Sequence, residues 1–175
     1  MIYIAFLRGI NVGGKNIVKM EELREVFESL GFSDVKTILN SGNVTFMSEG
    51  NDKKEMKIKI ENALKKTFGR EIAVLIRSCD DIRKLIQADP FKDIQVTKDT
   101  RLYVTFFSEK LQNTLKSAYI SPQKDLQILR LTNTEICIAV TISANKNTTD
   151  TMGFLEKEFG KKITTRNWNT VLKLV

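Results

Sequence analysis

The residues from Arg8 to Asn16 combine positive charge, amide groups and glycine in one short stretch. They read Arg8-Gly9-Ile10-Asn11-Val12-Gly13-Gly14-Lys15-Asn16 and hold three of the nine glycines in the 175-residue chain. Glycine adopts positive φ at no steric cost, so successive backbone N–H groups in such a loop can turn toward one anion. Arg8 and Lys15 would add charge, and Asn11 and Asn16 would orient the ligand. The stretch predicts a phosphate- or carboxylate-binding loop, and a loop that needs Gly and Asn only for its turns is the alternative.

The spacing of this loop also approaches that of a nucleotide-binding motif. Gly9, Gly14, Lys15 and Asn16 follow the pattern of the phosphate-binding loop up to its last position, where that motif has Ser or Thr. Asn16 lacks the hydroxyl that binds magnesium, and the strands that follow are expected to form a hairpin without a parallel crossover. The sequence therefore argues against a nucleotide hydrolase and leaves an anion-binding loop.

A second polar stretch lies near the C-terminus, where six consecutive residues carry hydrogen-bonding groups: Thr165, Arg166, Asn167, Trp168, Asn169 and Thr170. The start of a helix flanked by hydroxyl groups and Arg binds anions readily. The alternative is a capped helix with its tryptophan in the core. The segment Ser41-Gly42-Asn43 is a third candidate, in which Ser41 and Asn43 would supply polar groups, and its alternative is a plain turn.

The net charge of +7 (28 basic minus 21 acidic residues) is concentrated in two of these stretches. Residues 8–20 contribute +3 and residues 161–175 contribute +4, so the rest of the chain is balanced. Concentrated charge of one sign attracts anionic partners. We therefore expect the opening loop, the Ser41 turn and residues 164–170 to form one cleft for a small phosphate- or carboxylate-bearing ligand, clamped by Arg8 and Arg166. A basic tail and an unrelated loop are the alternative.

Composition excludes several kinds of chemistry. The chain has no histidine, which excludes Ser-His-Asp and Cys-His catalytic sites and zinc sites that contain histidine. Cys79 and Cys137 each lie in an apolar run and indicate buried thiols in a reducing compartment. No leader segment and no membrane span are expected, so the predicted location is cytoplasmic. No cofactor or metal is expected, and because no acid and base pair can be assigned, the sequence leaves open whether the protein is an enzyme.

The pattern of apolar residues predicts an α+β fold made of two ferredoxin-like units. Residues 2–7, 35–39, 44–47 and 72–76 are typical of strands, and helices are expected from Met20 to Leu30 and from Asp52 to Phe68. This order, βαββαβ, is that of the ferredoxin-like motif, an antiparallel sheet with two helices on one face. Ser78 and Asp81 resemble a capping box at the start of a further helix.

The second half repeats the order of the first with one strand missing. Strands are expected at residues 102–107, 126–131 and 136–142, with helices through Leu115 and Leu155. A terminal helix from Trp168 to Val175 takes the place of the last strand, with a strand from Thr170 as the alternative. The predicted organisation is residues 1–78 as the first unit, 79–100 as helix and linker, and 101–175 as the second unit, related to the first by structural duplication.

Two other functions stay open. Ferredoxin-like sheets resemble RNA-recognition modules, and the pI of about 9.4 would suit RNA. Those modules stack bases on exposed aromatic residues, and Tyr103, Phe106 and Phe107 form the one such cluster in the sequence. A non-catalytic protein-interaction module is the other alternative. The sequence predicts no membrane partner and leaves the oligomeric state open.

Several of these segments together resemble a known family. Residues 8–16, Met20, Leu23, residues 41–44, residues 164–170 and Lys173-Leu174 are similar to the signature blocks of the bacterial domain-of-unknown-function family 1697. The resemblance spans essentially the whole chain and implies a cytoplasmic α+β fold of two ferredoxin-like subdomains. It brings no established activity and no catalytic residue. The loop Asn145-Lys146-Asn147 departs from the family's version, which contains more Gly and Ser.

Overall fold

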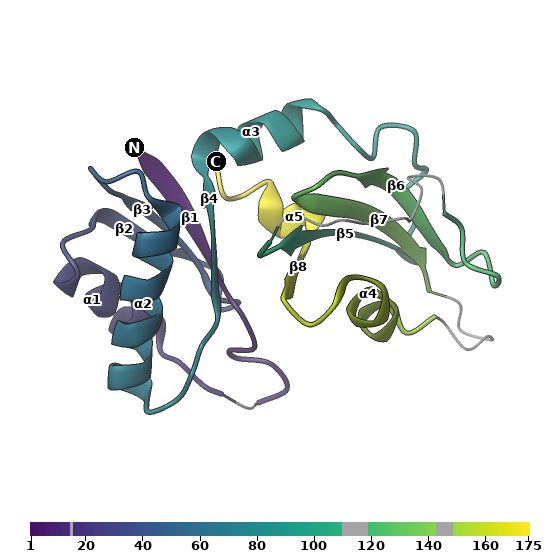
Figure 1. The fold of residues 1–175 in the computed structure, drawn as a ribbon. Coiled ribbons are helices and arrows are strands. Elements are labelled where there is room, and N and C mark those ends of the chain that lie inside the picture. Colours follow the sequence, from purple (N-terminus) through teal and green to yellow (C-terminus); the bar gives the residue numbers. More distant parts are fainter. Residues whose placement is uncertain (15, 110–118, 143–148) are drawn as a thin grey trace. The chain divides into compact units, whose positions relative to one another are not determined.

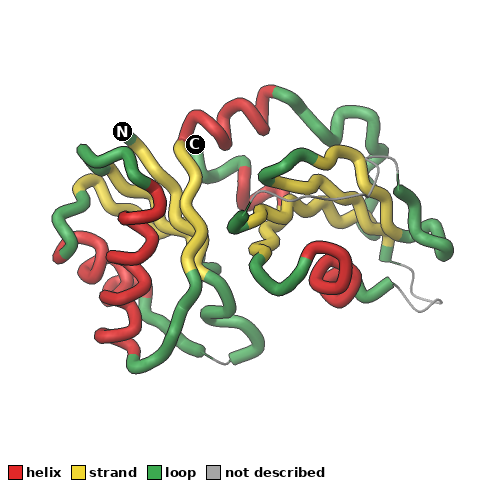
Figure 2. The backbone as a smooth tube through the Cα atoms, viewed as in Figure 1, coloured by secondary structure: helices red, strands yellow, loops and turns green. Residues whose placement is uncertain are grey.

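The computed structural model describes residues 1–14, 16–109, 119–142 and 149–175 of the chain (Figures 1 and 2). The chain divides into two compact units. Unit 1 is Met1–Lys84 together with Lys173–Val175, and unit 2 is Leu85–Leu172. Within the described residues, no helix combines the length and the apolar composition needed to cross a membrane.

Unit 1 contains a four-stranded antiparallel sheet with the strand order β2-β3-β1-β4. Its elements are β1 (Ile2–Leu7), α1 (Met20–Ser29), β2 (Ser33–Ile38), β3 (Asn43–Met47), α2 (Lys53–Phe68) and β4 (Val74–Ser78). The helices α1 and α2 cover one face of the sheet (Figure 1). This is the ferredoxin-like arrangement expected from the sequence, and α3 (Cys79–Gln87) follows it.

Local sequence signals explain where α2 begins and ends. Asp52 caps its start, because the carboxylate accepts hydrogen bonds from the backbone N–H groups of Lys54 and Glu55. Gly69 ends the helix in a left-handed conformation with φ 67°. Met56, Ile60 and Leu64 recur every four residues and are buried in the core under the sheet. The position of α2 therefore determines where the segment after Gly69 lies. That segment contacts the opening loop.

Unit 2 contains a second four-stranded antiparallel sheet, with the order β6-β7-β5-β8. Its elements are β5 (Thr100–Phe107), β6 (Leu126–Leu131), β7 (Glu135–Thr141), α4 (Thr151–Phe159), β8 (Ile163–Asn167) and α5 (Trp168–Val171). When the strands are numbered within each unit, the two sheets have the same order. Leu155 and Phe159 of α4 belong to the same buried core as Ile136 and Ile138 of β7.

The prediction that unit 2 lacks its last strand is wrong, because β8 supplies it. The β-branched residues Ile163, Thr164 and Thr165 pair with Phe107, Phe106 and Thr105 of β5. The hydroxyl groups of Thr105 and Thr165 are 2.8 Å apart and hydrogen-bond to each other, so a polar pair is satisfied inside the sheet. The run Thr164-Thr165-Arg166 does not look apolar in the sequence, which is why the strand was missed.

The terminal helix expected from Trp168 to Val175 is confirmed, but it is short. It covers only Trp168–Val171, and the Asn167 side chain caps it by accepting a hydrogen bond from the backbone N–H of Asn169. Three other predictions fall outside the described residues: the helix through Leu115, the loop from Asn145 to Asn147, and the position of Lys15. Cys79 and Cys137 are free and buried.

Candidate functional site

Asn11 holds the opening loop in its shape. Its Nδ2 donates hydrogen bonds to the carbonyl oxygens of Val18 and Asn40, each at 3.0 Å. Its Oδ1 accepts one from the backbone N–H of Val18 at 2.8 Å. Asn11 also adopts a positive φ of 53°, which asparagine tolerates better than most residues. Because both amide hydrogens are used within the protein, Asn11 supports the loop and ties it to the turn between β2 and β3.

Asn16 and Arg70 close the other end of the loop. Asn16 donates from Nδ2 to the carbonyl oxygen of Gly9 at 3.0 Å, and its Oδ1 accepts a hydrogen bond from Arg70 Nη1 at 2.9 Å. A second guanidinium nitrogen, Arg70 Nη2, donates to the carbonyl oxygen of Ile17 at 3.3 Å. Arg70 directly follows Gly69, so the end of α2 places it beside a loop that lies more than 50 positions earlier in the sequence.

A pocket of about 260 Å³ lies where these groups meet. Its lining residues come from the opening loop and from the segment before β4: Arg8, Gly9, Asn16, Arg70, Glu71, Ile72 and Ala73. The backbone N–H of Arg8 donates to the carbonyl oxygen of Ala73 at 2.9 Å and joins the two walls. The carboxylate of Glu71 lies 2.9 Å from Nζ of Lys65, and the hydrogen bond from Lys65 lowers the pKa of the Glu71 carboxyl group. Two arginines therefore face one pocket whose single acid is paired elsewhere.

The structure brings only some of the predicted loop residues to this pocket. Arg8 and Asn16 line it, whereas Asn11, Gly13 and Gly14 do not. Gly13 and Gly14 are exposed and have φ angles of 57° and 71°, so their glycine character is explained by the turn itself.

The turn between β2 and β3 packs against the opening loop. Asn43 is fully buried, and its Nδ2 donates to the carbonyl oxygen of Ile38 and to Ser41 Oγ. Gly42 has a φ of 72°, and a Cβ added there would lie 2.8 Å from Cγ1 of Ile10. The turn and the opening loop are therefore in contact within unit 1. Ser41 and Asn43 shape the turn and do not line the loop pocket.

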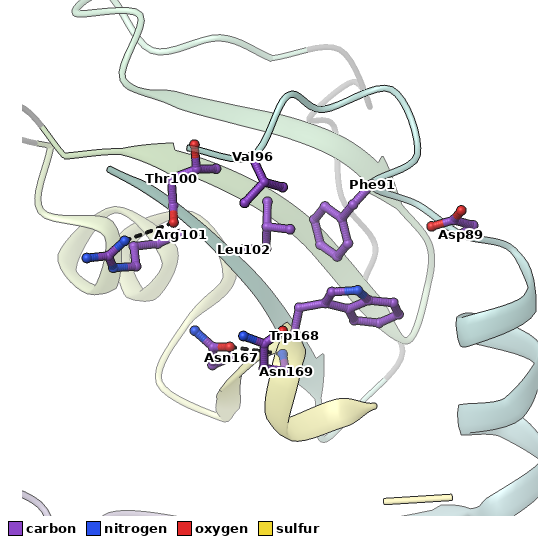
Figure 3. Close-up of a pocket in the computed structure, with 9 residues that line it drawn as sticks. All are labelled: Asp89, Phe91, Val96, Thr100, Arg101, Leu102, Asn167, Trp168 and Asn169. Atoms are coloured by element: carbon purple, nitrogen blue, oxygen red, sulfur yellow. Dashed lines mark hydrogen bonds between the residues drawn. The ribbon is translucent and has the colours of Figure 1, made fainter. Parts of the chain in front are cut away.

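The C-terminal stretch distributes its side chains over both faces of β8. Arg166 pairs in register with Val104, its Nη1 donates to the carbonyl oxygen of Thr165, and burial lowers the pKa of its guanidinium group to about 10. Thr165 and Asn167 line a pocket of about 470 Å³ beside α4. Asn167, Trp168 and Asn169 line another of about 510 Å³ (Figure 3). The hypothesis that Arg8 and Arg166 clamp one ligand stays a prediction.

The aromatic cluster considered for RNA binding is largely buried. Phe106 and Phe107 are 1% and 2% exposed, and Tyr103 packs against the core of unit 2. Base stacking needs aromatic faces that are open to solvent. The cluster therefore gives no support to the RNA-recognition alternative.

Comparison with known proteins identifies the family. Residues 1–136 match the model of the family described as "Protein of unknown function (DUF1697)". The chain belongs to the DUF1697 family. Its structure is similar to that of the conserved bacterial protein SP0830 from Streptococcus pneumoniae, with 26% identity, a TM-score of 0.75, and coverage of 99% of this chain and 96% of that one. No curated protein matches the chain.

Sequence reasoning missed several residues that line the pockets of this DUF1697 protein. Arg70 was not a candidate, and neither were Phe91 and Arg101, which line the pocket beside Trp168. Gly69 marked only the end of a helix, and Arg101 lies between the expected linker and the expected strand that begins at Leu102. No local pattern identifies these three residues, because the pockets that they line are completed by residues far away in the sequence.

Proposed function

We propose that the opening-loop pocket binds a small anion through a phosphate or carboxylate group. The observation that carries the proposal is that Arg8 and Arg70 line the same pocket of about 260 Å³. A guanidinium group offers a fork of N–H donors that matches such groups in two places at once. Pockets that hold small ligands are of roughly 300 Å³ and above, so this one suits a compact anion or the charged end of a larger molecule.

The bracing of the loop supports the same proposal. Asn11 and Asn16 hold the loop through hydrogen bonds to Val18, Asn40 and Gly9, so the walls are formed before a ligand arrives. A preformed site avoids the free-energy cost of ordering a loop on binding. Arg70 Nε is buried without a hydrogen-bond partner among the described residues, so this N–H group is available to a ligand or a water molecule.

Two wider inferences accompany this proposal. We infer a cytoplasmic location, because the free thiols of Cys79 and Cys137 suit a reducing compartment. The equal strand orders of the two sheets support the structural duplication suggested by the sequence. No observation on the described residues favours a second function over anion binding.

A thermal-shift titration with inorganic phosphate tests the proposal. Phosphate is expected to raise the unfolding midpoint of the parent, because a ligand that binds only the folded state stabilises it in proportion to its concentration over Kd. Arg70→Lys keeps the charge but removes the fork, and Arg8→Gln removes the charge. Each is expected to weaken phosphate binding at least tenfold, the equivalent of about 1.4 kcal/mol.

Arg24→Gln is the matched control. Arg24 lies on α1, forms an exposed ion pair with Glu28 at 3.6 Å and does not line the pocket. It removes the same charge from the same unit, so it separates a bound ligand from a general effect of net charge. Equal midpoint shifts in the parent, in Arg8→Gln and in Arg70→Lys would refute the proposal.

A further inference from the structure

The pocket beside Trp168 lies entirely within unit 2. Its walls are the segment that follows α3, the start of β5, and the junction of β8 with α5 (Figure 3). Its volume of about 510 Å³ falls within the range of small-molecule sites. It shares no residue with the opening-loop pocket, so a ligand bound here is independent of the anion proposed for that loop.

Apolar side chains gather in the middle of this pocket. The rings of Phe91 and Trp168 meet edge to face with their centroids 5.1 Å apart, and Val96 and Leu102 lie beside them (Figure 3). Val96 is 63% exposed, although it stands next to this apolar surface. An apolar body that entered the pocket would remove the Val96 side chain from water, which is favourable at about 25 cal/mol per Å² of buried area.

Hydrogen-bond donors stand at one end of the same pocket. The Oδ1 of Asn167 accepts the backbone N–H of Asn169 at 2.9 Å, which fixes the amide so that Nδ2 remains a donor. Nη1 of Arg101 donates hydrogen bonds to the carbonyl oxygens of Lys98 and Thr100, at 2.7 and 3.0 Å. In the part of the chain that the structure describes, Asn167 Nδ2 and the other guanidinium nitrogens of Arg101 have no hydrogen-bond partner.

The one acidic residue of the pocket is at the opposite end. Asp89 lies beyond Phe91, far from Asn167 and Arg101 in the view of Figure 3. The pocket is therefore divided into an apolar middle and a donor-rich end that carries a positive charge. A carboxylate has only acceptors and suits Nδ2 of an asparagine together with a guanidinium group.

We propose that this pocket binds a small organic carboxylate with a flat apolar body, whose ring contacts Phe91, Val96 and Trp168 while its carboxylate faces Asn167 and Arg101. The ring supplies the apolar contact and the carboxylate supplies the orientation. A ligand with only one of these parts loses the other contribution and binds more weakly.

The sequence contains a single tryptophan, and it lines this pocket, so its fluorescence reports binding there. Benzoate is the probe. It is expected to change the emission of Trp168 in a saturable manner and to protect the indole from quenching by acrylamide. Benzyl alcohol, which keeps the ring but has no charge, and acetate, which keeps the charge but has no ring, are each expected to bind at least tenfold more weakly.

Asn167→Asp is the decisive variant. Aspartate still accepts the Asn169 N–H and caps α5, but it replaces the Nδ2 donor by a negatively charged oxygen. It is expected to keep the fold, seen by circular dichroism, and to weaken benzoate binding at least tenfold. Asn133→Asp makes the same change at an exposed position in the turn between β6 and β7 and is expected to bind benzoate like the parent.

Two results would overturn this proposal. One is a parent protein whose tryptophan emission does not respond to benzoate up to millimolar concentration. The other is an Asn167→Asp variant that binds benzoate as tightly as the parent. Arg70→Lys separates the two proposals, because it lies in the opening-loop pocket and is expected to leave the benzoate titration unchanged.

Discussion

Glycine at position 42 is required for two separate reasons. Its φ of 72° is unfavourable for residues with a Cβ, and a Cβ there would also lie 2.8 Å from Ile10 Cγ1 and 3.1 Å from Leu7 Cβ. Gly14 has nearly the same φ, 71°, but a Cβ there would meet nothing within 4 Å. A comparison of Gly42 with Gly14 therefore separates the cost of backbone strain from the cost of steric contact between the turn and the opening loop.

We expect Gly14→Ala to lower the free energy of unfolding by about 1 kcal/mol, the usual cost of the left-handed conformation. Gly42→Ala is expected to cost about 2 to 3 kcal/mol, because overpacking adds to that cost. Urea denaturation of both variants measures the difference. If the two variants lose the same stability, Ile10 moves away at no cost and its contact with the turn does not help to hold the loop.

For single residues, the sequence showed the residue type but not the groups that it contacts. Asn11 and Asn43 were expected as ligand-binding residues, and the structure shows their amide groups engaged with the backbone of Val18, Asn40 and Ile38. An asparagine that orients a ligand and one that supports a loop look the same in a sequence. Only the distance to the next acceptor, set by the fold, distinguishes them.

The start of α3 shows what local sequence can specify. The predicted capping box is confirmed: the Asp81 N–H donates to Ser78 Oγ and the Ser78 N–H donates to Asp81 Oδ2, both at 3.2 Å. Lys53 of α2 adds an ion pair to Asp81 at 2.8 Å. Burial by itself would raise the pKa of Asp81, but the hydrogen bonds from Lys53 and Ser78 outweigh it and lower the pKa to about 2.

The lowered pKa of Asp81 predicts a stability that depends on pH. Because the folded state favours the ionised carboxylate, its contribution is complete above the unfolded pKa of about 3.9 and is lost as the pH falls toward 2. Asp81→Asn is expected to cost about 1 kcal/mol at pH 7, since the side chain is 44% exposed and solvent screens the pair. Urea denaturation at pH 7, 4 and 2.5 should show the gap to the parent closing.

Asp80→Asn is the control for this prediction. Asp80 forms an exposed ion pair with Arg83 at 3.0 Å, and its side chain is 67% exposed. It is expected to change the free energy of unfolding by less than about 0.5 kcal/mol at each pH. A gap between Asp81→Asn and the parent that stays constant from pH 7 to pH 2.5 would contradict the role given to the ionised carboxylate.

Elements whose apolar residues recur with a clear period were predicted correctly. The strand β8, which has no such period, was missed. Met56, Ile60 and Leu64 of α2 repeat on one helical face between two local caps, so neighbouring residues suffice to specify that helix. β8 contains Thr164 and Thr165, which become strand residues because β5 offers partners for them. The information that makes β8 a strand lies in β5, more than 50 residues earlier.

Each unit has a hydrophobic core of its own. Leu64 is fully buried in the core of unit 1, and Leu155 is fully buried in the core of unit 2. We expect Leu64→Ala and Leu155→Ala each to lower the free energy of unfolding by about 3 kcal/mol, through lost burial and the cavity left behind. Substitutions without shared contacts are additive to within about 0.5 kcal/mol.

The double variant measures whether the two cores are energetically separate. Its loss of stability in urea denaturation is expected to equal the sum of the two single losses. A difference of more than about 1 kcal/mol between the loss in the double variant and the sum of the single losses would show that the two cores are energetically coupled. Leu23→Ala combined with Leu64→Ala is the comparison, because both residues belong to the core of unit 1 and are free to couple.

In both sheets the strand that comes first in the sequence lies between the third and the fourth. Tyr3 of β1 pairs with Ser78, and Tyr103 of β5 pairs with Asn167, so each sheet is joined across nearly the whole length of its unit. Contacts between distant positions slow folding, because the chain loses entropy in closing long loops before such contacts form. During synthesis, β1 and β5 each emerge long before their last partner and expose an unpaired strand edge meanwhile. The arrangement that gives this protein two closed cores therefore also makes its newly made chain vulnerable to aggregation.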